Sequence, residues 1–495
     1  MLSLVRNSRI PILVLVLVLL SIPLPAQPPK PPAPSPTSGQ AAPAVVQPPR
    51  TASLDGIDVF IEAQMKEWKV PGMSLAIVQG GKIVLSKGYG FRDVEKKLPV
   101  TTKSLFAIGS ITKSFTVTVM GMLADEGKME WDKPVREYLP RFRLYDPLAS
   151  ERMTLRDLVT HRSGLPRHDA LWYNSPLTRP ELFERLRYLE PSKDFRERYQ
   201  YNNLMFMSAG ILAQELSGMR WEDLVRERIF KPLGMASSNF SVVDSQKSDD
   251  FAQPYALAKE ELKKVPFRNI DQVGPAGSIN SSAEDMSRYL LLHMNRGRIE
   301  GRQLLSEANA LQMQTPQMVI QGPLTFKELG YTSYGMAFTI GAYQGHTMVQ
   351  HGGAIDGFLA LLTFLPQGNV GIVVLTNGSG TPFTNVMNFN VMDRLLGLEK
   401  VDWSTRYRER QRKQQAAEEA AKQKGYTAPR PGTKPSHEIK EFAGDYEHPG
   451  YGILRIDIEG DALKLTYNDI TSPLRHYHYD IFESRSSLLN PTEPS

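Results

Sequence analysis

The chain has 495 residues, of which 41% are hydrophobic and 22% are charged, so it has the composition of an ordinary globular protein with room for two or three domains. The formal net charge is only +5, and no stripe of Lys and Arg alternates with aromatic residues, so nucleic-acid binding has little support. The sequence contains no cysteine, which excludes thiol nucleophiles, disulfides and cysteine-based zinc sites.

The N-terminus has the pattern of a targeting segment followed by a tether. Residues 1–26 combine the basic residues Arg6 and Arg9 with an apolar run over 10–22 and a small residue at a plausible cleavage point. This pattern predicts a secretory signal peptide, because the apolar run is short for a membrane span. An uncleaved N-terminal anchor is the alternative. Residues 27–50 are rich in Pro, Ala, Ser and Gln and predict a disordered linker, so we expect a secreted or periplasmic protein.

The first part of the folded body contains four clearly patterned segments. They are a helix over 53–68 with a Ser cap, strands over 72–79 and 82–91, and a helix over 110–126. Gly80 and Gly81 between the two strands predict a hairpin, and Gly127 predicts the end of the second helix. A long region of helices and loops follows, to about residue 325.

Strand patterns return late in the sequence. Apolar runs over 334–341, 358–366 and 370–378 predict strands, and a helix pattern follows over 384–396. Hairpins at both ends of the domain, with helices between them, predict one antiparallel sheet whose strands come from both ends. The expected fold class is therefore α/β (α+β): an antiparallel sheet flanked by helices, with a helical insertion.

The C-terminal part has a different character. A charged segment over 403–424 is rich in helix formers and predicts a solvated linker helix. Alternating apolar and polar residues around Gly460 then predict a β-hairpin in a small antiparallel unit. We expect a main domain over 51–400, a helical linker over 401–435 and a small β unit over 436–495 that could be incomplete.

Ser110 and Lys113 form the only Ser-x-x-Lys pattern in the chain. Three residues apart on a helix, the two side chains share a face and could form a hydrogen bond. A serine hydroxyl needs a base to become a nucleophile, and the apolar neighbours of Lys113 would lower its pKa toward that role. A Ser110 backbone N–H at a helix N-terminus would also favour a developing oxyanion. The alternative is a polar helix start, because serine is a common N-cap.

Two further patterns carry candidate functional residues. Tyr201 and Asn203 stand in a Tyr-x-Asn motif, where a phenol could relay protons and an amide could bind a substrate carbonyl, or where both could simply belong to a turn. His351-Gly352-Gly353 precedes the strand at 358–366 and would let a ligand approach the backbone closely. Near it, the N–H of Ala354 could be a second oxyanion donor, and His351 could face a substrate carboxylate or Tyr201. A bulge with a solvent-facing histidine is the alternative.

Other histidines have weaker patterns. His161 in "THRSGLP" is expected to be a turn or core residue. His476 and His478 alternate on a possible strand, but without a third ligand they do not make a metal site. We therefore predict no metal and no organic cofactor.

The order Ser-x-x-Lys, Tyr-x-Asn, His-x-Gly is specific in combination. With "VPGMSLAIVQGGKIVLSKGYGFRD" (70–93) and "MTLRDLVTHRSGLP" (153–166), it resembles the serine β-lactamase and penicillin-binding-protein superfamily over about residues 53–398. The chain looks most like the class C β-lactamase branch with its D-aminopeptidase and esterase relatives. The C-terminal unit resembles a small uncharacterised β domain often attached to such hydrolases. It could shape substrate access or serve as a passive stability module.

The resemblance implies roles for the motif residues. Ser110 would be the acylated nucleophile, Lys113 its proton acceptor and Tyr201 the proton relay. Asn203 would contact the substrate amide, with Gly353 at the substrate-binding strand. The backbone N–H groups of Ser110 and Ala354 would form the oxyanion hole. His351-Gly352-Gly353 stands where class C enzymes typically have Lys-Thr-Gly, which makes efficient β-lactam turnover doubtful.

The expected function is that of an exported serine hydrolase acting on an ester, an amide or a β-lactam, with small molecules or D-amino-acid peptides as substrates. One alternative is a DD-peptidase, D-aminopeptidase or esterase without useful β-lactamase activity. Another is a binding or sensor protein that is acylated but does not turn over. No nucleic-acid partner is expected, and membrane attachment only through an uncleaved signal.

Overall fold

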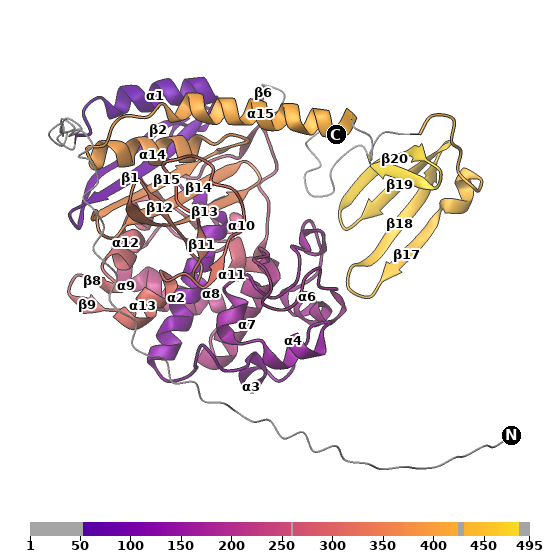
Figure 1. Ribbon diagram of the computed structural model, residues 1–495, viewed down its shortest axis with the longest axis horizontal. Helices are drawn as coiled ribbons and strands as arrows, with labels where there is room; N and C mark the ends of the chain where they lie inside the picture. The colour runs from indigo at the N-terminus through magenta and orange to yellow at the C-terminus, as the bar shows by residue number, and fades with distance from the viewer. Residues whose placement is uncertain (1–52, 259–260, 424–429, 485–495) are drawn as a thin grey trace, which may run out of the picture. The chain divides into compact units, whose positions relative to one another are not determined.

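The computed structural model describes residues 53–258, 261–423 and 430–484 (Figure 1). The predicted signal peptide (1–26) and the predicted linker (27–50) lie outside the described residues, so both stay predictions. Among the helices of the described part, none has the length and apolar character needed to cross a membrane.

A nine-stranded antiparallel sheet forms the centre of the main domain (Figure 1). Its strands, in spatial order, are β10 (Met318–Val319), β11 (Ser333–Tyr334), β12 (Thr339–Tyr343), β13 (His346–Ile355), β14 (Phe358–Leu365), β15 (Val370–Thr376), β1 (Gly72–Gln79), β2 (Lys82–Asp93) and β3 (Leu98–Pro99). The early strand β1 pairs with the late strand β15, with Met73 opposite Thr376. This pairing confirms the predicted sheet built from both ends of the domain.

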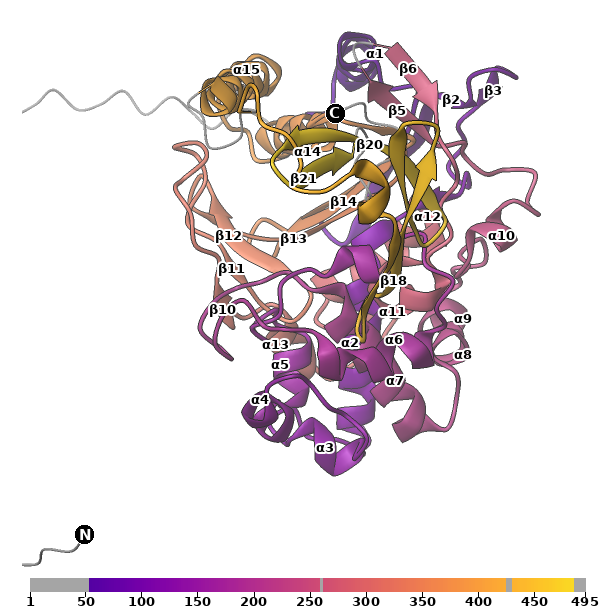
Figure 2. The ribbon, with the colours of Figure 1, turned by 90° about the vertical axis from the view of Figure 1, so that its right-hand side faces the viewer.

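Helices cover both faces of the sheet. The long helices are α1 (Ile57–Trp68), α2 (Thr112–Asp125), α7 (Asn203–Ser217), α12 (Ala283–Met294), α14 (Phe383–Leu395) and α15 (Trp403–Gln423). Figures 1 and 2 show α1, α14 and α15 on one face and the helical region with α2, α7 and α12 on the other. On β1, Leu75 and Ile77 pack toward the first face, whereas Ala76 and Val78 pack toward the second. A strand buried on both faces explains the continuous apolar run in the sequence.

The helical insertion fills the region between β3 and β10. Its shorter helices are α3 (Val135–Tyr138), α4 (Pro147–Arg152), α5 (Leu155–Leu158), α6 (Arg179–Arg185), α8 (Trp221–Val225), α9 (Lys231–Leu233), α10 (Val242–Ser245), α11 (Gly274–Gly277) and α13 (Glu307–Met313). Its small sheets comprise β4 (Phe106–Ala107) with β7 (Asn280–Ser281), β8 (Arg298–Ile299) with β9 (Arg302–Gln303), and β5 (Tyr255–Ala258) with β6 (Glu261–Lys264). The last of these is completed by β16 (Gly378–Ser379), which follows β15 in the chain and pairs with β5.

The C-terminal unit is a five-stranded antiparallel sheet. Its strands follow one another in chain order: β17 (Gly444–His448), β18 (Gly452–Glu459), β19 (Ala462–Tyr467), β20 (Ile470–His478) and β21 (Ile481–Ser484). Gly460, with φ of 64°, lies in the turn between β18 and β19, where the sequence predicts a hairpin. Ile456, Leu463, Leu465 and Tyr467 form a small apolar core of this unit.

Three local predictions differ from the structure. The first helix begins at Ile57, and its N-cap is Gly56, not a serine. The predicted strand over 334–341 is two short strands, because Ala337 has φ of 65° and breaks the extended backbone between them. His351 lies within strand β13, which the sequence analysis did not identify.

Candidate active site

Ser110 lies in the turn that leads into α2. It occupies the 3₁₀ turn Gly109–Ile111, and α2 begins directly afterwards at Thr112. The Thr112 hydroxyl accepts a hydrogen bond from the N–H of Ile279 over 3.2 Å, which fixes the start of the helix to the segment between α11 and β7. Ser110 is partly exposed, whereas Lys113, one turn later on the same face, is completely buried. The local fold therefore places a reachable hydroxyl above a buried amine.

Three oxygen atoms surround the side-chain nitrogen of Lys113. Its Nζ lies 2.7 Å from Asn203 Oδ1, 2.8 Å from the carbonyl oxygen of Ala276 and 3.0 Å from Ser110 Oγ. The first two oxygens can only accept hydrogen bonds, so they take two amine hydrogens. An uncharged amine has two hydrogens and one lone pair, and the lone pair is then left for the Ser110 hydroxyl. The arrangement directs the basic lone pair of a neutral lysine at the predicted nucleophile.

Burial also favours the neutral form of this lysine. It lowers the pKa of Lys113 well below the usual value, and the positive charge of Arg167 lowers it further, while the charge of Asp169 opposes the shift. A lysine with a lowered pKa is uncharged in a larger fraction of molecules near neutral pH and can accept a proton. Lys113 thus combines the geometry and the electrostatics of a general base.

Tyr201 lies beside this pair. Its ring centroid is 4.7 Å from Lys113 Nζ and 4.2 Å from the centroid of the fully buried His161 ring. Burial raises the pKa of Tyr201 above the usual value, and a hydrogen bond with Ser110 offsets this only in part. The phenol therefore keeps its proton near neutral pH. Lys113 is the group whose unprotonated form is available near neutral pH, and Tyr201 is suited to pass a proton on.

Asn203 is the first residue of α7, and Asn202 caps the helix by accepting a hydrogen bond from the N–H of Met205 over 3.0 Å. Asn203 Nδ2 donates to Asp169 Oδ1 over 3.1 Å. Because that carboxylate can only accept, the amide oxygen of Asn203 must face Lys113. Asn203 is buried and its observed bonds run to Asp169 and Lys113. Its expected contact with a substrate amide stays a prediction.

The backbone of strand β13 contacts the backbone of the turn that carries Ser110. A Cβ atom on Gly353 would lie 1.9 Å from the carbonyl oxygen of Ile108 and 3.2 Å from the nitrogen of Ser110. A Cβ atom on Gly109, whose φ is +51°, would lie 2.8 Å from the nitrogen of Ala354. Only glycine fits at either position. The backbone nitrogens of Ser110 and Ala354 lie at this same contact, where the sequence predicts the oxyanion hole.

His351 is buried on β13 and faces a different tyrosine from the one expected. Its Nε2 accepts a hydrogen bond from the Tyr334 hydroxyl over 2.9 Å, and its Nδ1–H donates to the Gly352 carbonyl over 2.7 Å. Burial lowers the pKa of His351 to about 3, so the imidazole is uncharged. Its ring centroid lies 6.5 Å from that of Tyr201. The alternative of a solvent-facing histidine is wrong, and a neutral imidazole offers no charge to a substrate carboxylate.

Two charged residues that the sequence analysis did not single out lie beside the site. Arg167 Nε donates to Asp169 Oδ2 over 2.5 Å, and the guanidinium carbon lies 5.0 Å from the centre of the Tyr201 ring. The Arg167 side chain is 58% exposed, so it presents a cation to solvent next to the predicted relay. In the sequence, the only signal for this pair is the polar run Arg167-His168-Asp169 after the Gly-Leu-Pro turn.

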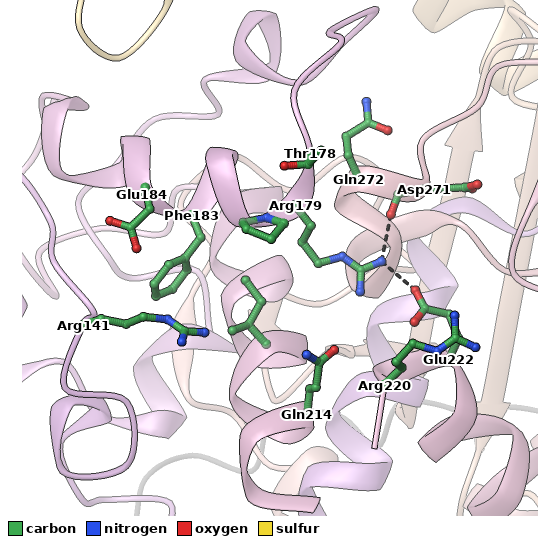
Figure 3. A pocket seen from close by; sticks show the side chains of 12 residues that line it. Arg141, Thr178, Arg179, Phe183, Glu184, Gln214, Arg220, Glu222, Asp271 and Gln272 are labelled. Carbon is green, nitrogen blue, oxygen red and sulfur yellow. Dashed lines mark hydrogen bonds and ion pairs between the residues drawn. The ribbon is translucent and has the colours of Figure 1, made fainter. Parts of the chain in front are cut away.

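A cavity of about 650 Å³ lies next to α6 and α7 (Figure 3). Arg179 Nη2 donates there to Glu222 over 2.7 Å and to the carbonyl oxygen of Asp271 over 2.8 Å. Arg141 and Arg220 line the same cavity and also pair with acidic residues. None of the predicted site residues lines this cavity. Among the described residues, no group of three or more His, Asp or Glu side chains is placed to hold a metal.

Comparison with known proteins adds an independent observation. The family model described as beta-lactamase matches residues 57–396, and a domain of unknown function, DUF3471, matches residues 428–491. The unguisins hydrolase ungD' of Aspergillus campestris is 31% identical over 436 residues, which cover 83% of this chain and 80% of that protein. Protein flp of Staphylococcus aureus strain N315 is 26% identical over 65% of this chain and 62% of its own length.

Solved structures show the same fold. The octameric penicillin-binding protein homologue of Pyrococcus abyssi has a TM-score of 0.62 and 26% identity, over 85% of this chain and 90% of that one. The D-alanine carboxypeptidase AmpC of Burkholderia cenocepacia has a TM-score of 0.55 and 22% identity, over 70% of this chain and 99% of that one. The match to the Pyrococcus abyssi protein covers 85% of this chain, a larger part than residues 57–396, which the beta-lactamase model matches.

Proposed function

The chain belongs to the beta-lactamase family, whose members are serine hydrolases, and on that premise we propose that it is an exported hydrolase that cleaves an ester, amide or β-lactam bond through an acyl-enzyme on Ser110. One observation carries the proposal more than any other. When Lys113 is neutral, Asn203 Oδ1 and the Ala276 carbonyl oxygen accept its two amine hydrogens, so its lone pair points toward Ser110 Oγ.

The acylation step follows from this geometry. Ser110 Oγ attacks the substrate carbonyl carbon, and its proton moves to Lys113 Nζ, directly or through the Tyr201 hydroxyl. The carbonyl oxygen becomes an oxyanion near the backbone N–H groups of Ser110 and Ala354. When the tetrahedral intermediate collapses, the bond to the leaving group breaks, and the protonated amine returns the proton through Tyr201 to the departing nitrogen or oxygen.

Deacylation uses the same groups, with a water molecule in place of Ser110 as the nucleophile. Lys113, neutral again, accepts a proton from a water molecule that attacks the ester carbonyl of the acyl-enzyme. The bond between Ser110 Oγ and the acyl carbon then breaks, and the proton returns to Oγ. The released product is a carboxylic acid, and the enzyme regains its starting protonation state. This cycle uses no metal and no organic cofactor.

A second candidate is a peptidase or esterase without useful β-lactamase activity. The neutral, buried state of His351 favours it, because this residue stands where class C β-lactamases typically carry the lysine of Lys-Thr-Gly. Without that cation, β13 itself holds no fixed charge for the carboxylate of a β-lactam. A relative of this chain is named as an unguisins hydrolase, and that name does not refer to a β-lactam.

The test compares the full chain with its Ser110→Ala variant on three substrates: a chromogenic cephalosporin, a short-chain nitrophenyl ester and a D-Ala-D-Ala peptide. Intact mass is followed in parallel. We expect turnover of at least one substrate by the parent chain and none by Ser110→Ala. Turnover of the ester or peptide without the cephalosporin supports the second candidate, and a stable adduct without turnover indicates a sensor.

Two matched controls separate chemistry from folding. Ser217→Ala removes a hydroxyl that bonds only to backbone groups at the C-terminal end of α7, those of Ala213, Gln214 and Met219. Lys128→Met removes an exposed amine paired with Glu126. Both should keep parental turnover, whereas Ser110→Ala and Lys113→Met should lose it. Parental turnover by Ser110→Ala on the substrate that works would contradict the mechanism. N-terminal sequencing of the protein recovered from outside the cytoplasm tests the export prediction.

A further inference from the structure

The loop of residues 166–174, called the bridging loop from here on, contacts the candidate active site through two charged side chains. Arg167 stacks on Tyr201, and Asp169 accepts a hydrogen bond from Asn203. The same two residues set opposing electrostatic contributions to the pKa of Lys113. The conformation of this loop therefore decides where two charges lie around the predicted base and relay.

The bridging loop also reaches the opposite edge of the site. The Tyr173 hydroxyl donates to Asp356 Oδ1 over 2.6 Å, and Arg268 Nε donates to Oδ2 of the same carboxylate over 2.9 Å. Asp356 stands two residues after Ala354, at the end of β13. One loop thus connects the Tyr201 side of the site with the strand that carries the second predicted oxyanion donor.

The other side of the bridging loop is held by the C-terminal sheet. Asn468, in the turn between β19 and β20, donates through Nδ2 to the carbonyl oxygens of Ala170 and Tyr173, over 3.2 Å each. The N–H of the next residue, Asp469, donates to the carbonyl oxygen of Asn174 over 3.2 Å. These three bonds attach backbone carbonyls of the loop, so they fix its course whatever its side chains are.

A fourth contact involves Tyr451. His168 Nε2 lies 3.3 Å from the carbonyl oxygen of Glu190, which can only accept, so this nitrogen carries the proton. Its Nδ1 then accepts the Tyr451 hydroxyl proton over 2.5 Å. His168 itself has φ of 49°, an unfavourable backbone conformation for a residue with a Cβ. Backbone of this kind persists only where surrounding contacts hold it in place.

We propose that the C-terminal sheet is a positioning element of the reaction centre: Asn468 and Tyr451 hold the bridging loop so that Arg167 and Asp169 keep their places beside Tyr201, Lys113 and Asn203. The inference rests on the proposed function and deepens it. It assigns a role to the part of the chain that matches a domain of unknown function. Neither Asn468 nor Tyr451 is a catalytic residue, because both act through the loop.

A passive stability module would behave differently. Its contacts would stabilise the fold without regard to which surface they cover. Here four hydrogen bonds from the C-terminal sheet end on the loop that also touches Tyr201 and Asn203. Loss of these bonds should change acylation more than it changes global stability.

The experiment uses the full chain and three substitutions. Asn468→Gly removes the amide and suits the left-handed backbone of this position, whose φ is 52°. Tyr451→Phe removes only the hydroxyl that donates to His168. The matched control is Tyr446→Phe, whose lost hydroxyl donates to the Phe442 carbonyl within the C-terminal unit itself.

Two readouts are taken for each protein: the rate at which a fluorophosphonate probe labels Ser110, and hydrogen exchange of the bridging loop by mass spectrometry. We expect Asn468→Gly to slow labelling about tenfold, Tyr451→Phe to slow it less, and both to raise exchange in the loop, because small misplacements of reacting groups carry large rate costs. Tyr446→Phe should match the parent in both readouts.

The outcomes separate this inference from the proposed function. Parental labelling rates in both Asn468→Gly and Tyr451→Phe contradict the inference, even if loop exchange or melting temperature changes. Equal slowing by Tyr446→Phe contradicts it too, because the effect would then be general to the unit. Absence of Ser110 labelling in the parent chain contradicts the proposed function itself.

Discussion

Lys113 donates a hydrogen bond to Asn203 over 2.7 Å, although the two residues are 90 positions apart in the sequence. The contact joins the last residue of the Ser-x-x-Lys pattern to the last residue of the Tyr-x-Asn pattern. It also fixes one hydrogen of the amine, which makes Asn203 the residue through which the protonation state of Lys113 can be changed most directly.

Asn203→Asp should therefore inactivate the enzyme near neutral pH. A carboxylate beside Lys113 stabilises the protonated amine and raises its pKa, so the lone pair needed for Ser110 is lost. We expect kcat/KM at pH 7 to fall by at least about tenfold and to recover partly at higher pH. The control is Asn295→Asp, at an exposed position where α12 ends. An unchanged pH–rate profile would show that Lys113 is not the base.

Arg167→Met should shift the acidic limb of the pH–rate profile. The positive charge of Arg167 lowers the pKa of Lys113, and Asp169 raises it. Removing the arginine deletes the first influence and frees the second, so the pKa of Lys113 rises. Activity needs the neutral amine and is lost as the pH falls through this pKa, so the loss should begin at a higher pH. Arg198→Met, at an exposed arginine paired with Glu197, should leave the limb in place, and a downward shift in Arg167→Met would contradict the electrostatic account.

Gly353→Ala and Gly352→Ala form a matched pair. At Gly353 the new Cβ would lie 1.9 Å from the Ile108 carbonyl oxygen, so β13 and the turn that carries Ser110 must separate. At Gly352 the nearest neighbour would be the Ala360 carbonyl oxygen at 3.8 Å, an ordinary contact. We expect Gly353→Ala to slow acylation about a hundredfold, and Gly352→Ala to keep nearly parental activity. Similar rates for the two variants would rule out β13 as part of the oxyanion site.

Tyr334→Phe should lower stability. The substitution leaves Nε2 of the buried His351 without its hydroxyl donor, which costs about 1–3 kcal/mol in the free energy of unfolding. Urea unfolding of the parent and the variant measures this difference. Tyr331→Phe, at a tyrosine that is 74% exposed, is the control and should unfold like the parent. A variant as stable as the parent would mean that the Tyr334 bond adds nothing to stability.

The sequence predicted those parts of the fold that depend on local pattern. The apolar run of β1, the Gly80-Gly81 turn and the spacing of Ser110 and Lys113 all follow from residues close together in the chain. Strand β13 was missed because "HTMVQHGGAI" lacks a clear apolar alternation, and its extended form comes from pairing with β12 and β14. The contacts of the sheet, and not the propensity of its residues, decide this strand.

The candidate site shows the same division. The residues that the motifs name lie near one another, but their partners could not be predicted. The Ala276 acceptor is a backbone carbonyl, which has no sequence signature. The Tyr334 partner of His351 lies on β11, a short strand that the break at Ala337 separates from β12. Arg167 and Asp169 are ordinary loop residues by composition. Their importance follows from where the loop folds back.

The pairing of β1 with β15 has a consequence for how the protein is made. Met73 leaves the ribosome long before Thr376, yet the two residues face each other in the sheet. Gly109 is likewise synthesised long before Ala354, which it contacts in the folded protein. Contacts so distant in sequence close late, because the intervening chain loses entropy before it gains their stabilisation. In a nascent or unfinished chain, Ser110 is therefore present before strand β13 contacts it. On the proposed mechanism, covalent labelling of Ser110 requires the completed sheet, and it would then serve as an assay of folding as well as of catalysis.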